Sequence, residues 1–196
     1  MADDLQSLFQ VLETERFTLH AVGRLAMARR MNAYMQSDEV RRTYSLLKKP
    51  PSLWQSLKRT RRPKKNKRFH HEIRVKATGD VIGAQSTTIT KTQYATMDVI
   101  IADLAWRGKN VVPEIRKALI TPMVTGGYIT QVTNHVYARN YGSILNYHKL
   151  GFDHVGTNYQ AAVDEFRGEH ADFLIFTLRG QALKDAVQAW AAEVDA

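Results

Sequence analysis

The segment WRGKNVV, residues 106–112, places two cations and one glycine between a strand-like run and a helix-like run. A short basic loop that leads from a strand into a helix is a common phosphate site, because the first N–H groups of the helix lack partners and its dipole favours an anion. Such loops are usually rich in glycine, whereas this one has only Gly108. The sequence therefore predicts an anion site and leaves open whether the ligand has been kept.

A second candidate site is the segment KRTRRPKKNKR, residues 58–68, which has eight basic residues and no acidic one. The formal net charge of the chain is +9, so the rest of the chain is nearly neutral. Pro63 and Asn66 predict an exposed, mobile loop. It binds nucleic acid or another acidic partner with salt-sensitive affinity, or it is a solvated insertion without contacts. Its basic residues are Lys58, Arg59, Arg61, Arg62, Lys64, Lys65, Lys67 and Arg68.

The composition excludes several other classes of protein. With 196 residues, of which 44% are hydrophobic and 24% charged, the chain predicts one globular domain. It has no cysteine, which excludes disulfides and thiolate chemistry. The acidic start MADDLQSLFQ is no signal peptide and no run is long enough to span a membrane, so we expect a cytoplasmic protein. His70 and His71 would point to opposite faces of a strand, and we predict no metal site.

Hydrophobic periodicity predicts antiparallel strands first, then a strand–helix–strand unit, then a helix and a final hairpin. The C-terminal segment 181–196 is predicted to form an amphipathic helix attached to a domain of residues 1–180, with Leu183, Val187, Trp190 and Val194 on one stripe. Strands are expected at residues 15–22, 69–77, 81–90, 95–103, 128–138, 152–160 and 171–179. Helices are expected at residues 24–35, 37–47, 52–58, 113–124, 141–150 and 180–194.

Four stretches in this order resemble the GNAT superfamily of acyl-CoA-dependent N-acyltransferases, and most of all the branch that acetylates N-terminal amines of ribosomal proteins. The resemblance implies an α+β fold with a mixed central sheet of about six to seven strands, helices on both faces, and two parallel strands that splay apart. The splayed strands would be residues 96–102 and 128–137. The four stretches are TERFTLHAV, GDVIGAQSTTI, WRGKNVVPEIRKALI and NHVYARNYGSILNYHKLGFDHVG.

The resemblance also implies a site for acetyl-CoA, with the pantetheine arm between the splayed strands and the pyrophosphate on residues 107–112. The family loop has the pattern R-x-x-G-x-G, but Asn110 and Val112 replace its two glycines. Asparagine tolerates a left-handed backbone, whereas branched valine disfavours one. Pro113 removes one backbone donor, although proline is common in a first helical turn. The implied cofactor residues are Val99, Ile100, Ile101, Arg107, Gly108, Lys109, Asn110, Val111, Val112, Asn140 and Ser143.

The catalytic residues come from the same resemblance, and each also has a plain structural interpretation. Tyr147 would protonate the departing thiolate, or it is a core aromatic. Asp98 would act as general base, or it faces solvent. Asn140 would bind the pantetheine arm, or it caps a helix, and Ser143 has a similar local alternative in the first turn. The oxyanion donor would be a backbone N–H near Val99 or Ile100.

Two functions therefore remain open after the sequence alone. The first is an N-acetyltransferase that uses acetyl-CoA and acts on a primary amine of a protein or peptide, to which the basic segment would recruit an acidic or nucleic-acid-associated partner. The second is an inactive GNAT-fold module with a binding or structural role, as known for degenerate members in phage particles. The replaced glycines favour the second function, whereas Asn140 and Tyr147 favour the first. The oligomeric state is not indicated.

Overall fold

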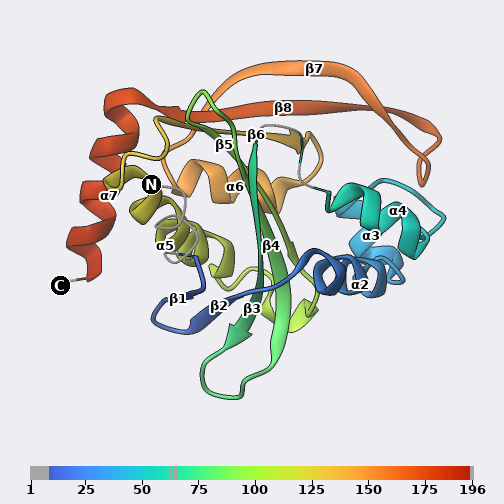
Figure 1. Ribbon diagram of the computed structural model, residues 1–196. Coiled ribbons are helices and arrows are strands. Elements are labelled where there is room, and N and C mark those ends of the chain that lie inside the picture. The colour runs from blue at the N-terminus through green and yellow to red at the C-terminus, as the bar shows by residue number, and fades with distance from the viewer. Residues whose placement is uncertain (1–8, 62, 64–65, 195–196) are drawn as a thin grey trace.

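The computed structural model describes residues 9–61, 63 and 66–194, which form a mixed sheet of eight strands in the order β1-β2-β3-β4-β5-β6-β8-β7 (Figure 1). Neighbouring strands pair antiparallel except β5 and β6, which are parallel. The α+β class and the parallel pair are confirmed. The strands are β1 (Val11–Glu13), β2 (Phe17–Ala21), β3 (Lys67–Val75), β4 (Val81–Ile89), β5 (Tyr94–Ile101), β6 (Gln131–Tyr137), β7 (Asp153–Asp164) and β8 (Glu169–Arg179).

The sheet has one strand more than the sequence predicted. The additional strand is β1, which pairs with β2 through Val11, Leu12 and Glu13. Three residues are too few to show the alternation by which strands are recognised in a sequence.

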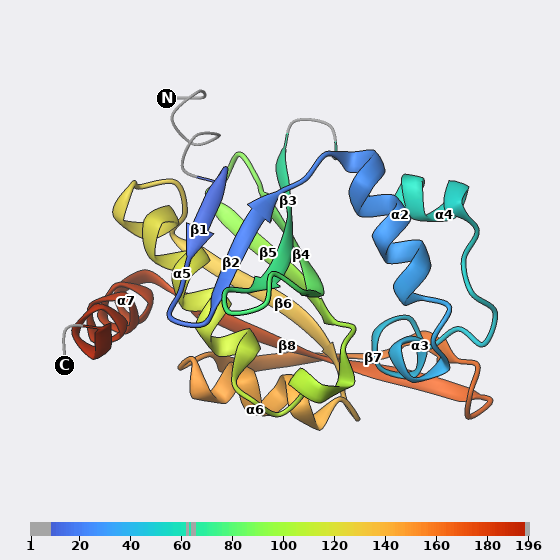
Figure 2. The ribbon, with the colours of Figure 1, turned by 90° about the horizontal axis from the view of Figure 1, so that it is seen from below.

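Helices cover both faces of the sheet, as Figure 2 shows. The hydrophobic cores confirm this division. One core joins the sheet to α5, α6 and α7, and a smaller one joins Ile100 of β5 to Met35 at the end of α2 and to Val40 of α3. The helices are α2 (Arg24–Tyr34), α3 (Asp38–Tyr44), α4 (Leu53–Arg59), the 3-10 turn η1 (Leu104–Trp106), α5 (Val111–Thr125), α6 (Tyr141–Lys149) and α7 (Gly180–Val194).

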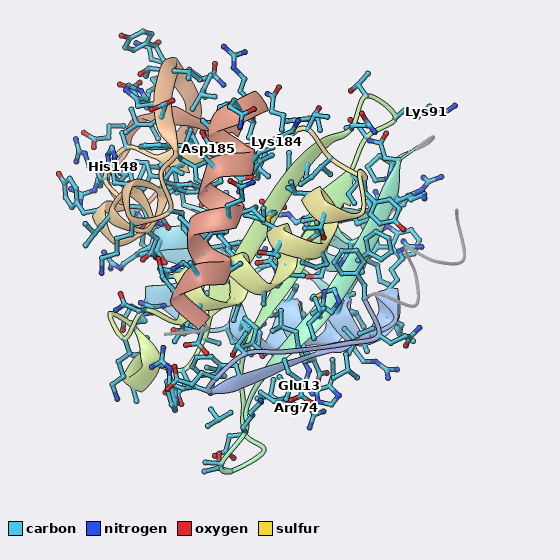
Figure 3. The ribbon with its side chains drawn as sticks, turned by 90° about the vertical axis from the view of Figure 1, so that its left-hand side faces the viewer. Glu13, Arg74, Lys91, His148, Lys184 and Asp185 are labelled. Carbon is cyan, nitrogen blue, oxygen red and sulfur yellow. The ribbon has the colours of Figure 1, made fainter. Side chains whose placement is uncertain are left out.

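The C-terminal helix α7 lies against α5 and is part of the main core (Figure 3). Leu183, Val187 and Trp190 are buried on it at 1%, 5% and 6% exposure, as their helical spacing predicted. The side chain of Val194 lies outside the described residues. Lys184 and Asp185 lie on the outward side of the helix (Figure 3). Residues 180–193 therefore pack as an integral layer of the domain.

Gly83 allows β4 to approach β5 very closely. A Cβ atom built on Gly83 would lie 2.3 Å from the carbonyl oxygen of Ile100, which is closer than non-bonded atoms can come. Gly83 faces Ile101 across the two strands, near the end of β5 that leads to the predicted phosphate loop. Glycine at residue 83 therefore allows the end of β5, which leads to the candidate site, to lie close against β4.

The basic segment 58–68 is not one continuous loop, contrary to the sequence prediction. Lys58 and Arg59 end α4, and Lys67 and Arg68 begin β3. The Arg68 guanidinium donates to the carbonyl oxygens of Arg59 and Arg61, at 2.9 and 3.1 Å. Its side chain is 16% exposed, so it closes the segment rather than facing outwards. The predicted partner-binding residues Arg62, Lys64 and Lys65 lie outside the described residues.

Candidate active site

The two parallel strands β5 and β6 separate soon after they begin. They pair through Tyr94 with Gln131 and through Ala95 with Val132, and no further pair is formed between them in the described chain. Two residues further along each strand, the side-chain amide of Asn134 in β6 bridges the gap to Met97 in β5. Its Oδ1 accepts from the N–H of Met97 at 2.9 Å, and its Nδ2 donates to the carbonyl oxygen of Met97. The predicted divergence is therefore present, with a side chain at its narrow end.

Beyond this bridge, one edge of β5 is open. Both backbone groups of Met97 face Asn134, and backbone groups of a strand alternate sides with each residue. The N–H and C=O of Val99 therefore point to the same open edge, whereas those of Ile100 point to Ala84 of β4. Of the two N–H groups that the sequence proposed as oxyanion donors, the geometry leaves only that of Val99 available.

A cavity of about 230 Å³ opens where the strands have separated. It lies between the end of β5, helix α3, the first turn of α5, and α6. Ten of the eleven predicted cofactor residues line it, together with Val40, Thr43 and Tyr44 of α3. The ten residues are Val99, Ile100, Ile101, Arg107, Gly108, Asn110, Val111, Val112, Asn140 and Ser143.

The loop before α5 uses left-handed backbone at two positions. Gly108 has φ of 74° and Asn110 has φ of 57°, so asparagine does stand where a left-handed residue is needed. The prediction that valine would be strained at position 112 is wrong. Val112 is the second residue of α5 and has ordinary helical backbone, because the helix begins at Val111. Branched residues adopt this conformation without a left-handed penalty.

The N-terminus of α5 offers free donors to the cavity. The N–H groups of residues 108–112 meet no acceptor within the described part of the chain, as expected for residues that precede or open a helix. Pro113 occupies the first turn, where its missing N–H costs little. The helix has fifteen residues, so its dipole adds to the attraction for an anion. This end of the cavity is suited to a phosphate group.

Three cations lie near this helix end, in different arrangements. Arg107 lines the cavity and forms an ion pair of 2.9 Å with Glu39 of α3. Lys149 of α6, which the sequence analysis did not select, also lines it and donates to Asn110 Oδ1 at 2.7 Å. Lys109, which it did select, is not among the lining residues, and its ammonium lies 5.3 Å from the centre of the Trp106 ring. Lys149 lies in the stretch NHVYARNYGSILNYHKLGFDHVG that resembles the family, but no role at the site was predicted for it.

Asn140 and Ser143 line the cavity and also hold the start of α6. The Oδ1 atom of Asn140 accepts from the N–H of Ser143 at 3.2 Å, so Asn140 is the N-cap of the helix. Its Nδ2 donates to the carbonyl oxygen of Thr43 at 3.3 Å, which ties α6 to α3. The capping interpretation is therefore correct. The same side chain borders the cavity, so it could also contact pantetheine, and that contact stays a prediction.

Tyr147 lies at the narrow end of the divergence rather than on the wall of the cavity. Its side chain is 3% exposed and packs between Phe152 and Phe176. The phenol oxygen accepts from Arg116 Nη2 at 2.8 Å and from Asn134 Nδ2 at 2.7 Å. Burial raises the pKa of Tyr147, and Arg116 and Asn134 oppose this shift. Tyr147 is thus a core aromatic whose hydroxyl reaches the gap between β5 and β6.

Asp98 lies on the other face of β5, next to the cavity residue Val99. Its side chain is 55% exposed, and one carboxylate oxygen is 3.9 Å from Arg68. Neighbouring side chains reduce the hydration of the carboxyl group and raise its pKa, while Arg68 and Arg116 lower it. Reduced hydration of the phenol raises the pKa of Tyr44, and the charge of Asp98 raises it further. Asp98 is accessible to an acceptor that approaches from the side of α3.

The strand order and the cavity define the class: the chain has the GNAT fold. One solved structure with this fold is RimL, the ribosomal L7/L12 α-N-protein acetyltransferase in complex with coenzyme A. It covers 88% of this chain and 99% of its own, with a TM-score of 0.70 and 14% identity. The match to a GCN5-related N-acetyltransferase from Brucella melitensis covers 94% of this chain and 85% of that protein, with a TM-score of 0.70 and 15% identity.

A third similar structure is a chimera of the spermidine N-acetyltransferase SpeG from Vibrio cholerae and hSSAT. It covers 88% of this chain and 99% of its own, with a TM-score of 0.69 and 16% identity. Comparison of the sequence with family models and with curated proteins gives no match. No helix in the described residues is long and apolar enough to cross a bilayer. Since identities this low establish the fold alone, the activity must be argued from the site.

Proposed function

We propose that this protein transfers an acetyl group from acetyl-CoA to a primary amine of a protein or peptide. The observation that carries the proposal is the combination of two free binding elements in one cavity. The open edge of β5 at Val99 can pair with the amides of the pantetheine arm, and the N-terminus of α5 can hold the pyrophosphate. Both lie where the strands separate, in a fold shared with a coenzyme A complex.

The reaction needs three further groups, and the structure offers a candidate for each. The amine nitrogen attacks the thioester carbonyl, a C–N bond forms and the C–S bond breaks. Asp98 would take the proton that the amine loses, because it lies beside Val99 and is exposed. The N–H of Val99 would stabilise the negative oxygen, and Tyr147 would protonate the sulfur. Tyr147 is buried, so this last role requires the ligand to enter the gap as far as Asn134.

Binding of acetyl-CoA can be tested with a charge placed at the helix N-terminus. At a hundredfold excess over Kd, a ligand adds about 2.7 kcal/mol of stability, so a clear rise in Tm is expected for the unmodified protein. Val112→Glu should abolish that rise, since its carboxylate would repel the pyrophosphate, while the helix dipole keeps the fold stable. Val112→Gln is the matched neutral control and should retain most of it. The measurement is a thermal shift with acetyl-CoA at low salt.

The alternative is an inactive GNAT-fold module, and the buried position of Tyr147 is the observation in its favour. If acetyl-CoA causes no thermal shift in the unmodified protein at low salt, the enzyme proposal is removed and the module remains. A shift without release of coenzyme A in the presence of amine acceptors would indicate a binding protein.

We further propose that the acceptor is acidic or associated with nucleic acid. Lys58, Arg59 and Arg61 are exposed at and after the end of α4, close to Arg68, which faces Asp98. Lys67 is also exposed, but as the neighbour of Arg68 in β3 it points to the opposite face of the sheet. Trp54, which is 66% exposed, lies with its ring 5.7 Å from the Lys58 ammonium. Exposed aromatic rings beside cations are a common surface for single-stranded nucleic acid, and cations alone suffice for acidic peptides.

Neutralising the basic segment should weaken this partner selectively. The variant R61Q/R62Q/K64Q/K65Q should bind an acidic peptide or a single-stranded oligonucleotide at least tenfold more weakly at low salt, and the affinity of the unmodified protein should fall steeply with salt. Fluorescence anisotropy measures both. Lys184→Gln and Lys91→Gln, on α7 and in the β4–β5 turn (Figure 3), are controls. A loss of affinity per removed charge that is as large in these controls as in the fourfold variant would show that only net charge matters.

A further inference from the structure

Arg116 of α5 is a buried cation for which the proposed reaction has no direct use. Its exposure is 4%, and no carboxylate of the described residues forms an ion pair with it. Its Nε and Nη1 atoms are buried and have no hydrogen-bond partner in this part of the chain. A buried charge with unpaired donors is costly to the folded state. We therefore expect the contacts that Arg116 does make to contribute to function rather than to stability.

Those contacts converge on Tyr147. The Nη2 atom donates to the phenol oxygen at 2.8 Å and to the carbonyl oxygen of Met97 at 3.2 Å. The guanidinium carbon lies 4.3 Å from the centre of the Tyr147 ring. From β6, Asn134 Nδ2 donates to the same phenol oxygen at 2.7 Å. The amide cannot be turned round, because its Oδ1 accepts from the N–H of Met97.

This arrangement determines the direction of the phenol proton. A phenol oxygen can accept two hydrogen bonds and donate one. Arg116 and Asn134 can only donate here, so they occupy both acceptor positions. The O–H of Tyr147 is then left to donate, and no hydrogen bond from it is formed to another described residue. A new acceptor that enters between β5 and β6 would therefore find this proton available.

We propose that Arg116 and Asn134 are positioning residues that present the Tyr147 proton to the leaving sulfur and stabilise the phenolate that results. The inference rests on the proposed acetyl transfer. In the step, the O–H bond of Tyr147 breaks and an S–H bond forms, and the negative charge moves from sulfur to the phenol oxygen. Two donors, one of them cationic, already face that oxygen. The phenolate regains its proton from water after coenzyme A leaves.

Other charges around Tyr147 are few. Burial raises the pKa of Tyr147 and the charge of Asp98 raises it further, whereas Arg116 lowers it. The side chains that contact the ring from β8 and from the end of α6 are Phe176 and Phe152, which are apolar. Arg116 is therefore the dominant favourable charge for the phenolate.

The experiment removes the charge of Arg116 and follows Tyr147 directly. Arg116→Met keeps much of the side-chain volume. Ionisation of Tyr147 is measured as the difference in ultraviolet absorbance between matched proteins with and without Tyr147→Phe. We expect Arg116→Met to move this ionisation to a pH higher by about one unit or more, a tenfold change in the equilibrium. Arg116→Lys should move it less. Unchanged ionisation in a folded Arg116→Met protein would overturn the proposal.

Kinetics give the second measurement. Arg116→Met and Asn134→Ala should each lower kcat by about tenfold or more with little change in KM for acetyl-CoA, and neither should lower kcat further when Tyr147 is already phenylalanine. Additive losses in that background would show a merely structural role. If the protein has no transferase activity, the proposed function fails, while the ionisation experiment still decides whether Arg116 acts on Tyr147.

Discussion

Asp98→Asn is expected to lower kcat/KM for acetyl transfer by about 10²- to 10⁴-fold, the usual contribution of a general base. Asparagine has nearly the same size and cannot accept the proton. Because only the carboxylate is a base, the activity of the unmodified protein should fall as pH decreases through the pKa of Asp98. Neighbouring side chains reduce the hydration of this carboxyl group and raise its pKa above the ordinary value of aspartate, so the acidic limb should lie at higher pH than for a free side chain.

The limb should be absent in Asp98→Asn, while any limb that belongs to the acceptor amine remains. Arg68→Gln should move the limb to higher pH, since the guanidinium lowers the pKa of Asp98. The control is Asp80→Asn, in the exposed turn before β4, which changes net charge equally. Initial rates of coenzyme A release across pH provide the measurement. Full activity of the Asp98→Asn protein would contradict the role of Asp98 as general base. It would mean that the acceptor amine reaches the site already deprotonated.

Trp190→Ala is expected to lower the free energy of unfolding by about 3–5 kcal/mol, as large-to-small substitutions of buried aromatic residues do. Trp190 is 6% exposed and belongs to the core that contains α5. Urea unfolding should show a lower midpoint with an unchanged slope. Since α5 also carries the anion site, the loss should be accompanied by weaker binding of acetyl-CoA.

Gln188→Ala, on the exposed side of the same helix, is the control and should change stability by about 0.5 kcal/mol or less. If α7 were an appendage to a domain that ends at residue 180, Trp190→Ala would behave like this control. That outcome would contradict the packing of α7 as a layer of the domain.

Much of the fold follows from local patterns in the sequence. The period-two and helical patterns predicted seven of the eight strands and the six α-helices of the described residues. Ser37, at the predicted start of one helix, caps it in the structure, where its Oγ accepts from the N–H of Val40. The left-handed backbone at Asn110 follows from residue preference alone. These features depend on residues that are near one another in the chain, which is why they can be inferred without the fold.

The misses concern residues whose roles depend on distant partners. Asn134 resembles any polar residue in a strand, and only the separation of β5 from β6 gives its amide a backbone to bind. Arg116 resembles a solvent-facing cation of an amphipathic helix, yet it is buried against Tyr147. The error at Val112 came from assuming that a motif glycine marks a left-handed position, whereas Val112 already lies inside α5, which begins at Val111. Arg68 was grouped with a charge run from which β3 removes it.

The bridge made by Asn134 has a consequence for how entry to the cleft could change during evolution. Main-chain hydrogen bonds join β5 and β6 only at their first two residues, and a single amide group spans the next position. The side chain at position 134, rather than the backbone of the two strands, therefore limits how far a ligand can enter between β5 and β6. A shorter side chain at position 134 would extend the gap between β5 and β6, and a longer one would fill it. In both cases β5 would stay paired with β4, and β6 with β8.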